Sequence, residues 1–187
     1  MQALAPRRIR PHRRRVRQDL FMTDSRSRTF DWADPAKALE QSRNAGTGLD
    51  ALQAMIDGAI PPPPIARMMG FSLIEVRDGF AMFECEPAEF HYNPIGAVHG
   101  GLACTLLDSA LGCAGHTTLP AGVGYTSIDL NVRYLRPITH SSGVLRATGR
   151  VIKPGRRVIF TEGELTDAAG RAVATATSSL LVLASTD

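Results

Sequence analysis

The sequence predicts an α+β fold in which a curved antiparallel sheet of five to six strands wraps one long central helix. The helix is expected over about residues 97–116, because the stretch from Leu102 to Gly115 is apolar apart from a single charge, Asp108. The segments on both sides alternate apolar and polar residues with a period of two, which is typical of half-buried strands. A sheet with one apolar face must cover an apolar partner, and this helix is the only long one available.

The first 64 residues precede this unit and divide into two parts. Residues 1–47 are predicted to be a disordered Arg-rich leader and a polar segment, since no hydrophobic pattern indicates a helix or strand there. Residues 48–64 are predicted to be an N-terminal helix and a Pro-rich connector, because four consecutive prolines end the helical pattern. Three apolar residues share one face of this helix, namely Leu49, Leu52 and Ile56. We expect the helix to act as a lid or a brace.

Two strands are expected before the central helix and three or four after it. Phe71–Arg77 and Phe80–Glu86 flank the turn dipeptide Asp78-Gly79 and therefore predict a hairpin. The later strands are expected at residues 125–135, 143–153, 157–165 and 171–183. In the first of these, apolar residues at 128, 130, 132 and 134 alternate with polar ones. We therefore expect one face of that strand to be buried and the other to be polar.

The formal net charge of +3 is unevenly distributed along the chain. Residues 1–21 contain seven arginines and one aspartate, a balance of +6, which leaves −3 for residues 22–187. This leader has no apolar core, so it is not a secretory signal. We interpret it as an extension ahead of Met22, with a nucleic-acid-binding arm or a mitochondrial transit peptide as alternatives.

Composition also sets the expected compartment and excludes some classes of protein. The three cysteines, Cys85, Cys104 and Cys113, are odd in number and show no CxxC spacing, which indicates reduced thiols and argues against zinc. No run of 18 apolar residues is present, so we expect no membrane span. We predict a cytoplasmic protein, with the mitochondrial matrix as the alternative.

The loop from Asn93 to Gly101 is the strongest indication of function. It ends in His99-Gly100-Gly101 and opens the central helix, so several backbone N–H groups and the positive end of the helix dipole face outward. This arrangement is typical of an oxyanion hole. Asp108 follows on the same helix, and a buried unpaired carboxylate there would cost several kcal/mol, so it must be partnered, protonated or used.

The spacing of these residues resembles a known family. The pattern is N-x5-HGG-x6-D from Asn93 to Asp108, and it is followed by the strand sequence SIDLNVRY from Ser127 and by Arg136-Pro137. Together they resemble the hotdog-fold acyl-CoA thioesterases of the phenylacetate-degradation branch (PaaI-type) over about residues 65–184. The resemblance implies a hotdog thioesterase domain at residues 65–187. It also implies that two protomers join their sheets edge to edge, as a homodimer or a dimer of dimers, with active sites at the interface.

The resemblance further implies an activity and a catalytic group. The expected reaction is hydrolysis of a small to medium acyl-CoA to the free acid and coenzyme A, so coenzyme A is part of the substrate and no cofactor is required. Asp108, from the partner protomer, would be the general base or the nucleophile. Gly100, with Gly101 as a second candidate, would supply backbone N–H groups to the oxyanion hole, and glycine at these positions would let the acyl group approach closely.

Other residues have supporting roles in this interpretation. Asn93 would orient the attacking water, His99 would hold the loop or the thioester oxygen, and Ser127 would be a secondary water-positioning group. His99, Ser127 and Asp108 could instead be structural: a single histidine is more often a satisfied structural residue, and Asp108 could be bonded to a neighbouring strand. The remaining histidines lack partners at ligand spacing and are expected at the surface or in loops, namely His91, His116 and His140.

Several arginines have two interpretations. They form a solvated face in most proteins, yet arginine also pairs with phosphate bidentately, so they could contact coenzyme A. The candidates for this are Arg133, Arg156 and Arg157. A different class of function stays open, a non-catalytic hotdog module that binds acyl-CoA as a sensor. Nucleic acid is not expected as a partner, because the arginine-rich tail shows no helix-turn-helix pattern, and a dehydrating hotdog enzyme is a lesser alternative.

Overall fold

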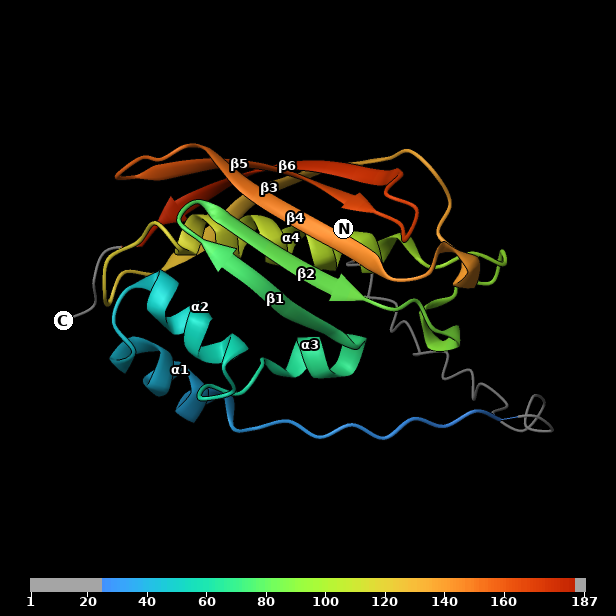
Figure 1. Cartoon of the computed structure of the whole chain (residues 1–187), viewed down its shortest axis with the longest axis horizontal. Helices are drawn as coiled ribbons and strands as arrows, with labels where there is room; N and C mark the ends of the chain where they lie inside the picture. Colours follow the sequence, from blue (N-terminus) through green and yellow to red (C-terminus); the bar gives the residue numbers. More distant parts are fainter. Residues whose placement is uncertain (1–24, 184–187) are drawn as a thin grey trace, which may run out of the picture.

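A six-stranded antiparallel sheet wraps the 17-residue helix α4 (Gly100–His116) in the computed structural model, which describes residues 25–183 (Figure 1). The α+β fold predicted from the alternating segments and the single apolar helix is therefore confirmed. The interpretation of residues 1–21 as a leader lies outside the described residues. Within residues 25–183 no helix is long and apolar enough to cross a membrane.

Three short helices precede the sheet and lie together beside its β1 edge (Figure 1). They are α1 (Pro35–Asn44), α2 (Gly48–Ile56) and α3 (Pro64–Met69). The prediction of α2 is confirmed, and Thr47 caps it by accepting a hydrogen bond from the Asp50 backbone N–H. The prediction of loop or coil was wrong for α1, because Asp34 caps that helix and Pro35 begins it, a local signal that hydrophobic periodicity does not register.

The strands follow the predicted hairpin and the four predicted later strands closely. Their order across the sheet is β1-β2-β4-β5-β6-β3, with every neighbouring pair antiparallel, so β1 and β3 are the two edges. The strands are β1 (Phe71–Arg77), β2 (Phe80–Cys85), β3 (Tyr125–Tyr134), β4 (Leu145–Lys153), β5 (Val158–Thr166) and β6 (Ala172–Val182). Two 3₁₀ helices lie in the connections, η2 (Glu89–His91) and η3 (His140–Ser142).

The core lies between α4 and the concave face of the sheet. The leucines of the buried side of α4 are at most 2% exposed, namely Leu102, Leu106, Leu107 and Leu111. They pack in one cluster with apolar residues of β2, β4, β5 and β6. Glycine lets the sheet approach the helix, since a Cβ at Gly149 of β4 would lie 2.2 Å from the Ala110 carbonyl oxygen. A helix and sheet in such close contact fix where every side chain of α4 points.

The edge strand β3 departs from the predicted burial pattern. We expected one buried apolar face, but Ile128 is 56% exposed and Tyr134 is 54% exposed, while Leu130 and Val132 are only partly buried. A register shift between Ser127 and Asp129 interrupts the alternation at Ile128. In addition, β3 is an edge strand that pairs only with β6. Its apolar side chains are therefore less covered than those of the central strands.

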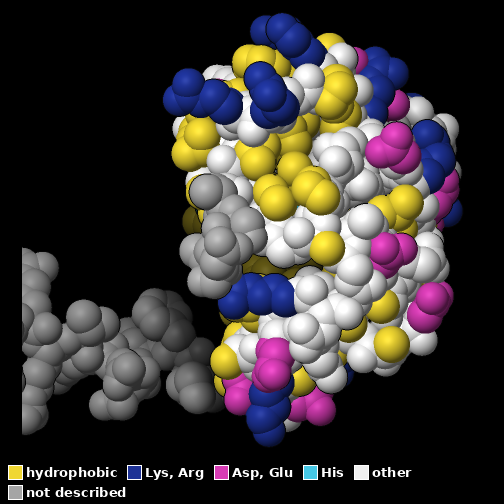
Figure 2. Space-filling model, turned by 90° about the vertical axis from the view of Figure 1, so that its left-hand side faces the viewer, with side chains coloured by type: hydrophobic (Ala, Val, Ile, Leu, Met, Phe, Trp, Pro, Cys, Tyr) yellow, Lys and Arg dark blue, Asp and Glu magenta, His cyan; other side chains and the backbone are white. Residues whose placement is uncertain are grey.

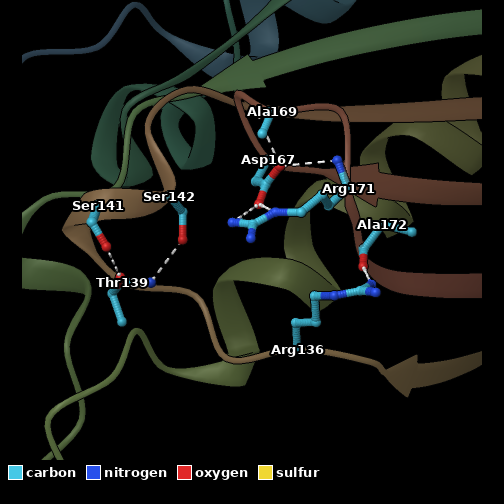
Figure 3. A network of polar contacts seen from close by, with 8 residues as sticks. All are labelled: Arg136, Thr139, Ser141, Ser142, Asp167, Ala169, Arg171 and Ala172. Carbon is cyan, nitrogen blue, oxygen red and sulfur yellow. Dashed lines mark hydrogen bonds and ion pairs between the residues drawn. The ribbon is translucent and has the colours of Figure 1, made fainter.

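A polar network closes the β5–β6 turn beside the end of β3 (Figure 3). The Asp167 carboxylate accepts hydrogen bonds from the backbone N–H groups of Ala169 and Arg171 and forms an ion pair with the Arg171 guanidinium at 2.7 Å. Arg171 lowers the pKa of Asp167 through this contact. Arg136 donates to the Ala172 carbonyl oxygen, which joins the end of β3 to the start of β6. These bonds are internal, so the network has a structural role.

Candidate active site

The loop before α4 is held by its own polar side chains. Asn93 Oδ1 accepts a hydrogen bond from the Ile95 N–H at 3.0 Å, and the Asn93 N–H donates to the Ala97 carbonyl at 2.9 Å. His99 caps the helix, because its Nδ1 accepts from the Gly101 N–H at 2.9 Å. The Gly101 N–H is therefore occupied. No acceptor for the Gly100 N–H is present within residues 25–183, so this group is available at the positive end of α4.

Tyr134, at the end of β3, covers this helix start. Its hydroxyl donates to the Gly100 carbonyl oxygen at 3.2 Å and lies 2.9 Å from Cys104 Sγ. A Cβ at Gly100 would lie 2.9 Å from the Tyr134 hydroxyl, so a larger residue there would require the exposed ring to move. Sequence reasoning assigned Tyr134 to a buried strand face and missed this contact. Its position nine residues beyond the start of a strand gave no signal that it would reach the loop.

Asp108 lies on the side of α4 that the sheet leaves open. We expected a carboxylate buried on an apolar helix, but Asp108 is exposed in the single chain. The apolar residues around it in sequence point to the other side of α4, into the core. Ser127 of the edge strand β3 donates to Asp108 Oδ1 at 3.0 Å. The structure thus brings together two predicted site residues that are 19 positions apart.

The structure does not bring Asp108 to the loop within one chain. Asp108 follows Gly100 by eight residues on the same helix, and at 1.5 Å per residue this is about 12 Å along the axis. Asn93, His99 and Gly100 therefore form one group at the start of the helix. Asp108 and Ser127 form a second group near its middle. One thioester carbon cannot contact both groups of the same chain.

The predicted substrate-binding arginines lie in two separate places. Arg156 lines a cavity of about 520 Å³ together with apolar residues such as Leu119 and Ile159. Arg157 is exposed in the same β4–β5 turn. The end of the molecule that carries this turn is shown in Figure 2, where basic side chains lie beside an apolar surface. Arg133 instead lines a hollow of about 600 Å³ on the outer face of the sheet, among threonines and glutamates.

Two histidines are more buried than predicted. His91 was expected at the surface or in a loop, but it is 6% exposed: its Nδ1 accepts from the Ala88 N–H, and Nε2 lies 2.8 Å from the Met69 carbonyl oxygen. Burial lowers the pKa of His91, which keeps the ring neutral. Burial also lowers the pKa of His116, at the end of α4. Both rings are structural, and His91 supports the loop, since its carbonyl accepts from the His99 N–H at 2.8 Å.

Comparisons with known proteins agree with this architecture. A sequence model of the thioesterase superfamily matches residues 95–174, which include the start of α4, Asp108 and Ser127. Acyl-coenzyme A thioesterase 13 of Homo sapiens is 33% identical over 110 residues, which cover 58% of this chain and 77% of the relative.

Solved structures give the same result. A phenylacetic acid degradation-related protein of Ralstonia eutropha superposes with a TM-score of 0.64 at 30% identity, covering 70% of this chain and 98% of that one. The Escherichia coli PaaI protein shares the fold, with a TM-score of 0.63 at 20% identity over 80% of this chain and 96% of that one. The predicted hotdog fold is confirmed, and with it the assignment to the thioester hydrolases. The chain belongs to the thioesterase superfamily.

Proposed function

We propose that this protein hydrolyses the thioester of small to medium acyl-CoA molecules, with Asp108 as general base or nucleophile and the Gly100 N–H as oxyanion donor. The observation that carries the proposal is the pair formed by exposed Asp108 and Ser127, beside an open sheet edge. The carboxylate is accessible and oriented by a hydrogen bond of 3.0 Å. Such orientation is what a group that must meet a substrate carbonyl requires.

The start of α4 supports the oxyanion part of the proposal. The Gly100 N–H has no acceptor among the described residues and lies at the positive end of a 17-residue helix. A donor of this kind, aimed at the developing oxyanion, contributes on the order of 3 kcal/mol to lowering the barrier. The Gly101 N–H is bonded to His99 Nδ1, which leaves Nε2 of a neutral His99 ring as a second donor for the thioester oxygen. Asn93 is in the same loop, where it orients the attacking water.

Asp108 can act by two routes. As a general base it takes a proton from water, the water oxygen attacks the thioester carbon, and the tetrahedral intermediate releases the coenzyme A thiolate. As a nucleophile it attacks the carbon directly, expels the thiolate and forms a mixed anhydride that water then hydrolyses. In both routes negative charge develops on the carbonyl oxygen, where the Gly100 N–H would bind it. Ser127 holds the carboxylate in both.

A second copy of the chain completes the site in this proposal. The separation of about 12 Å along α4 keeps Asp108 away from its own Gly100 loop. β3 is an edge strand whose exposed residues, among them Ile128, lie next to Ser127. Pairing of two β3 edges would cover these residues and bring Asp108 of one chain to the loop of the other. The assembly is then a homodimer, or a dimer of two such dimers, with two sites in each pair.

The two arginine locations suggest how coenzyme A is bound. Arg156 and Arg157 lie at the mouth of the cavity near the end of α4, where apolar atoms can cover the pantetheine arm and the guanidinium groups can pair with phosphate. Both arginines can be located along β6: Arg133 is opposite Thr175 in the β3–β6 pairing, and the Arg157 carbonyl accepts a hydrogen bond from the Val182 N–H. Thr175 and Val182 are seven residues apart on β6, or roughly 23 Å. Arg133 would therefore contact a different part of the ligand or a ligand held by the other chain.

The direct test is release of free thiol from a panel of acyl-CoA molecules. Replacing Asp108 by Asn should lower kcat by roughly 100-fold or more and leave KM within a few-fold, because the carboxylate acts in the transition state. The matched control is Asp78→Asn, which neutralises an exposed carboxylate in the β1–β2 turn and should retain full turnover. Acyl-CoA binding by the wild-type chain without thiol release would instead support the sensor function.

Subunit mixing tests the shared site. An Asp108→Asn chain mixed with an Asn93→Ala chain should recover activity, because half of the randomly formed dimers contain one site with both groups intact. About a quarter of the wild-type sites should then be active. Verified subunit exchange without recovery would show that each site is built within one chain.

A further inference from the structure

Gly112 of α4 is in contact with the hydroxyl of Tyr125, the first residue of β3. A Cβ at Gly112 would lie 2.6 Å from the Tyr125 hydroxyl oxygen. Gly112 follows Asp108 by four residues, and residues at this spacing are neighbours on one face of a helix, about 5–6 Å apart at Cβ. The phenol oxygen of Tyr125 therefore fills the space that a side chain at position 112 would occupy, one helical turn from Asp108.

The surroundings of Tyr125 keep this hydroxyl protonated and fixed. The ring lies 5.4 Å from the His116 ring, and the Cys113 side chain interacts electrostatically with the hydroxyl. Burial, together with the Cys113 and Asp108 charges, raises the pKa of Tyr125 well above its usual value. The phenol oxygen also lies beside Gly112, one helical turn from Asp108. At neutral pH the phenol retains its proton and can donate or accept a hydrogen bond.

Two hydroxyls of one strand consequently approach Asp108. Ser127 donates to Oδ1 at 3.0 Å from the exposed side. Tyr125, two residues earlier, reaches the same face of α4 one helical turn further along, through the space that Gly112 leaves.

The N-terminal helices support this end of the molecule, since the Gly48 N–H of α2 donates to the Leu119 carbonyl at 3.0 Å in the connection between α4 and β3.

We propose that Tyr125 is a positioning residue for hydrolysis, and that its hydroxyl, presented at Gly112, orients the water that Asp108 activates or that hydrolyses the anhydride. The inference rests on the proposed function. The phenol forms no covalent bond and loses no proton. It holds the water oxygen by a hydrogen bond while Asp108 accepts the water proton, so its contribution is alignment of the attacking atom.

The test is the variant Tyr125→Phe, which keeps the ring and removes the hydroxyl. We expect kcat to fall about 10-fold while KM stays within twofold, because alignment acts on the chemical step. The matched control is Thr161→Val, which removes a hydroxyl that is 1% exposed on β5, bonded to the Ser178 carbonyl and outside the proposed site. Thr161→Val should retain the wild-type kcat, so a loss confined to Tyr125→Phe is not a general effect of removing a buried hydroxyl.

A second variant keeps the hydroxyl and displaces it. Gly112→Ala should lower kcat by a similar factor, because the new Cβ occupies the position of the phenol oxygen. The double variant Gly112→Ala/Tyr125→Phe should lose less than the product of the two single losses, since both act on one hydroxyl. A folded Tyr125→Phe chain with wild-type kcat, or multiplicative losses in the double variant, would overturn the inference. A wild-type chain that releases no thiol from any acyl-CoA would instead reject the proposed function.

Discussion

The two ends of α4 are each covered by a tyrosine of β3 that lies over a glycine and beside a cysteine, yet the two ends differ in exposure. At the start of the helix, Tyr134 is 54% exposed and is held by its hydrogen bond to the Gly100 carbonyl. Toward the other end, Tyr125 is packed against His116 and Gly112. The first contact lies in water, whereas Tyr125 is partly buried and packed on two sides, so similar residue types give an adjustable end and a more rigid end.

This difference matches what each end has to do in the proposed reaction. The start of α4 must admit a thioester carbonyl to the Gly100 N–H, and an exposed ring can move aside for it. The Tyr125 end must hold the face that carries Asp108 in one position. The cysteine at the Tyr125 end is also shielded from solvent, since burial raises the pKa of the Cys113 thiol to about 12.

Truncating the two tyrosines should separate the two ends most strongly. Tyr125→Ala should lower the free energy of unfolding by about 3 kcal/mol, the low end of the range for removing a buried aromatic ring, because Tyr125 is only partly buried. Tyr134→Ala should cost roughly 1 kcal/mol, because the ring is already half in water. Urea denaturation at one fixed protein concentration measures both, since a self-associating chain gains stability with concentration. Equal losses would show that the two ends are equally rigid.

Adding a methyl group beneath each ring is a gentler perturbation. Gly112→Ala forces a Cβ to within 2.6 Å of a confined hydroxyl and should destabilise by about 1–2 kcal/mol, even though alanine favours the helix. Gly100→Ala meets a ring that can rotate into solvent, so its effect on unfolding should be within about 0.5 kcal/mol. The same thermal or urea unfolding assay compares the pair. A larger loss for Gly100→Ala would contradict the assignment of the adjustable end.

Acid titration provides a further comparison of the buried and exposed sides. Burial lowers the pKa of His91 and of His116 below their usual value in the folded chain. The unfolded chain therefore binds more protons below about pH 6.5, and the free energy of unfolding should fall as the pH falls through that region. His116→Gln should reduce the fall. Unchanged pH dependence in that variant would show that His116 is solvated.

The smallest effect leaves the fold intact and concerns thiol reactivity. At pH 8 a thiol with a pKa near 12 is ionised in about one molecule in ten thousand, so Cys113 should resist alkylation. The buried Cys85, whose pKa burial raises to about 11, should also resist. Cys104, partly exposed beside Tyr134, should be labelled first by iodoacetamide under native conditions. Mass spectrometry of the labelled peptides measures the order, and early labelling of Cys113 would mean that its end of α4 opens.

The sequence by itself predicted the six strands, the central helix and the candidate site residues. Period-two alternation located the hairpin and the later strands, and an apolar stretch with one charge located α4, because hydrophobic periodicity is a local property of the chain. The order of residues from Asn93 to Asp108, together with the strand sequence that begins at Ser127, was sufficient to indicate the family. The sequence also contained a local signal for α1, because Asp34 and Pro35 mark the start of that helix. The segment was nevertheless predicted as coil, because its composition is polar.

Only the tertiary structure decided which of these residues meet. Whether Asp108 is buried depends on which side of α4 the sheet covers, and the exposure of Ile128 depends on β3 being an edge strand. Ser127, Tyr125 and Tyr134 contact α4 because β3 crosses that helix, which no spacing in the sequence records. Such contacts join residues between 13 and 34 positions apart. They are set by strand order and packing, because the free energy of a contact depends on the three-dimensional neighbours that exclude water from it.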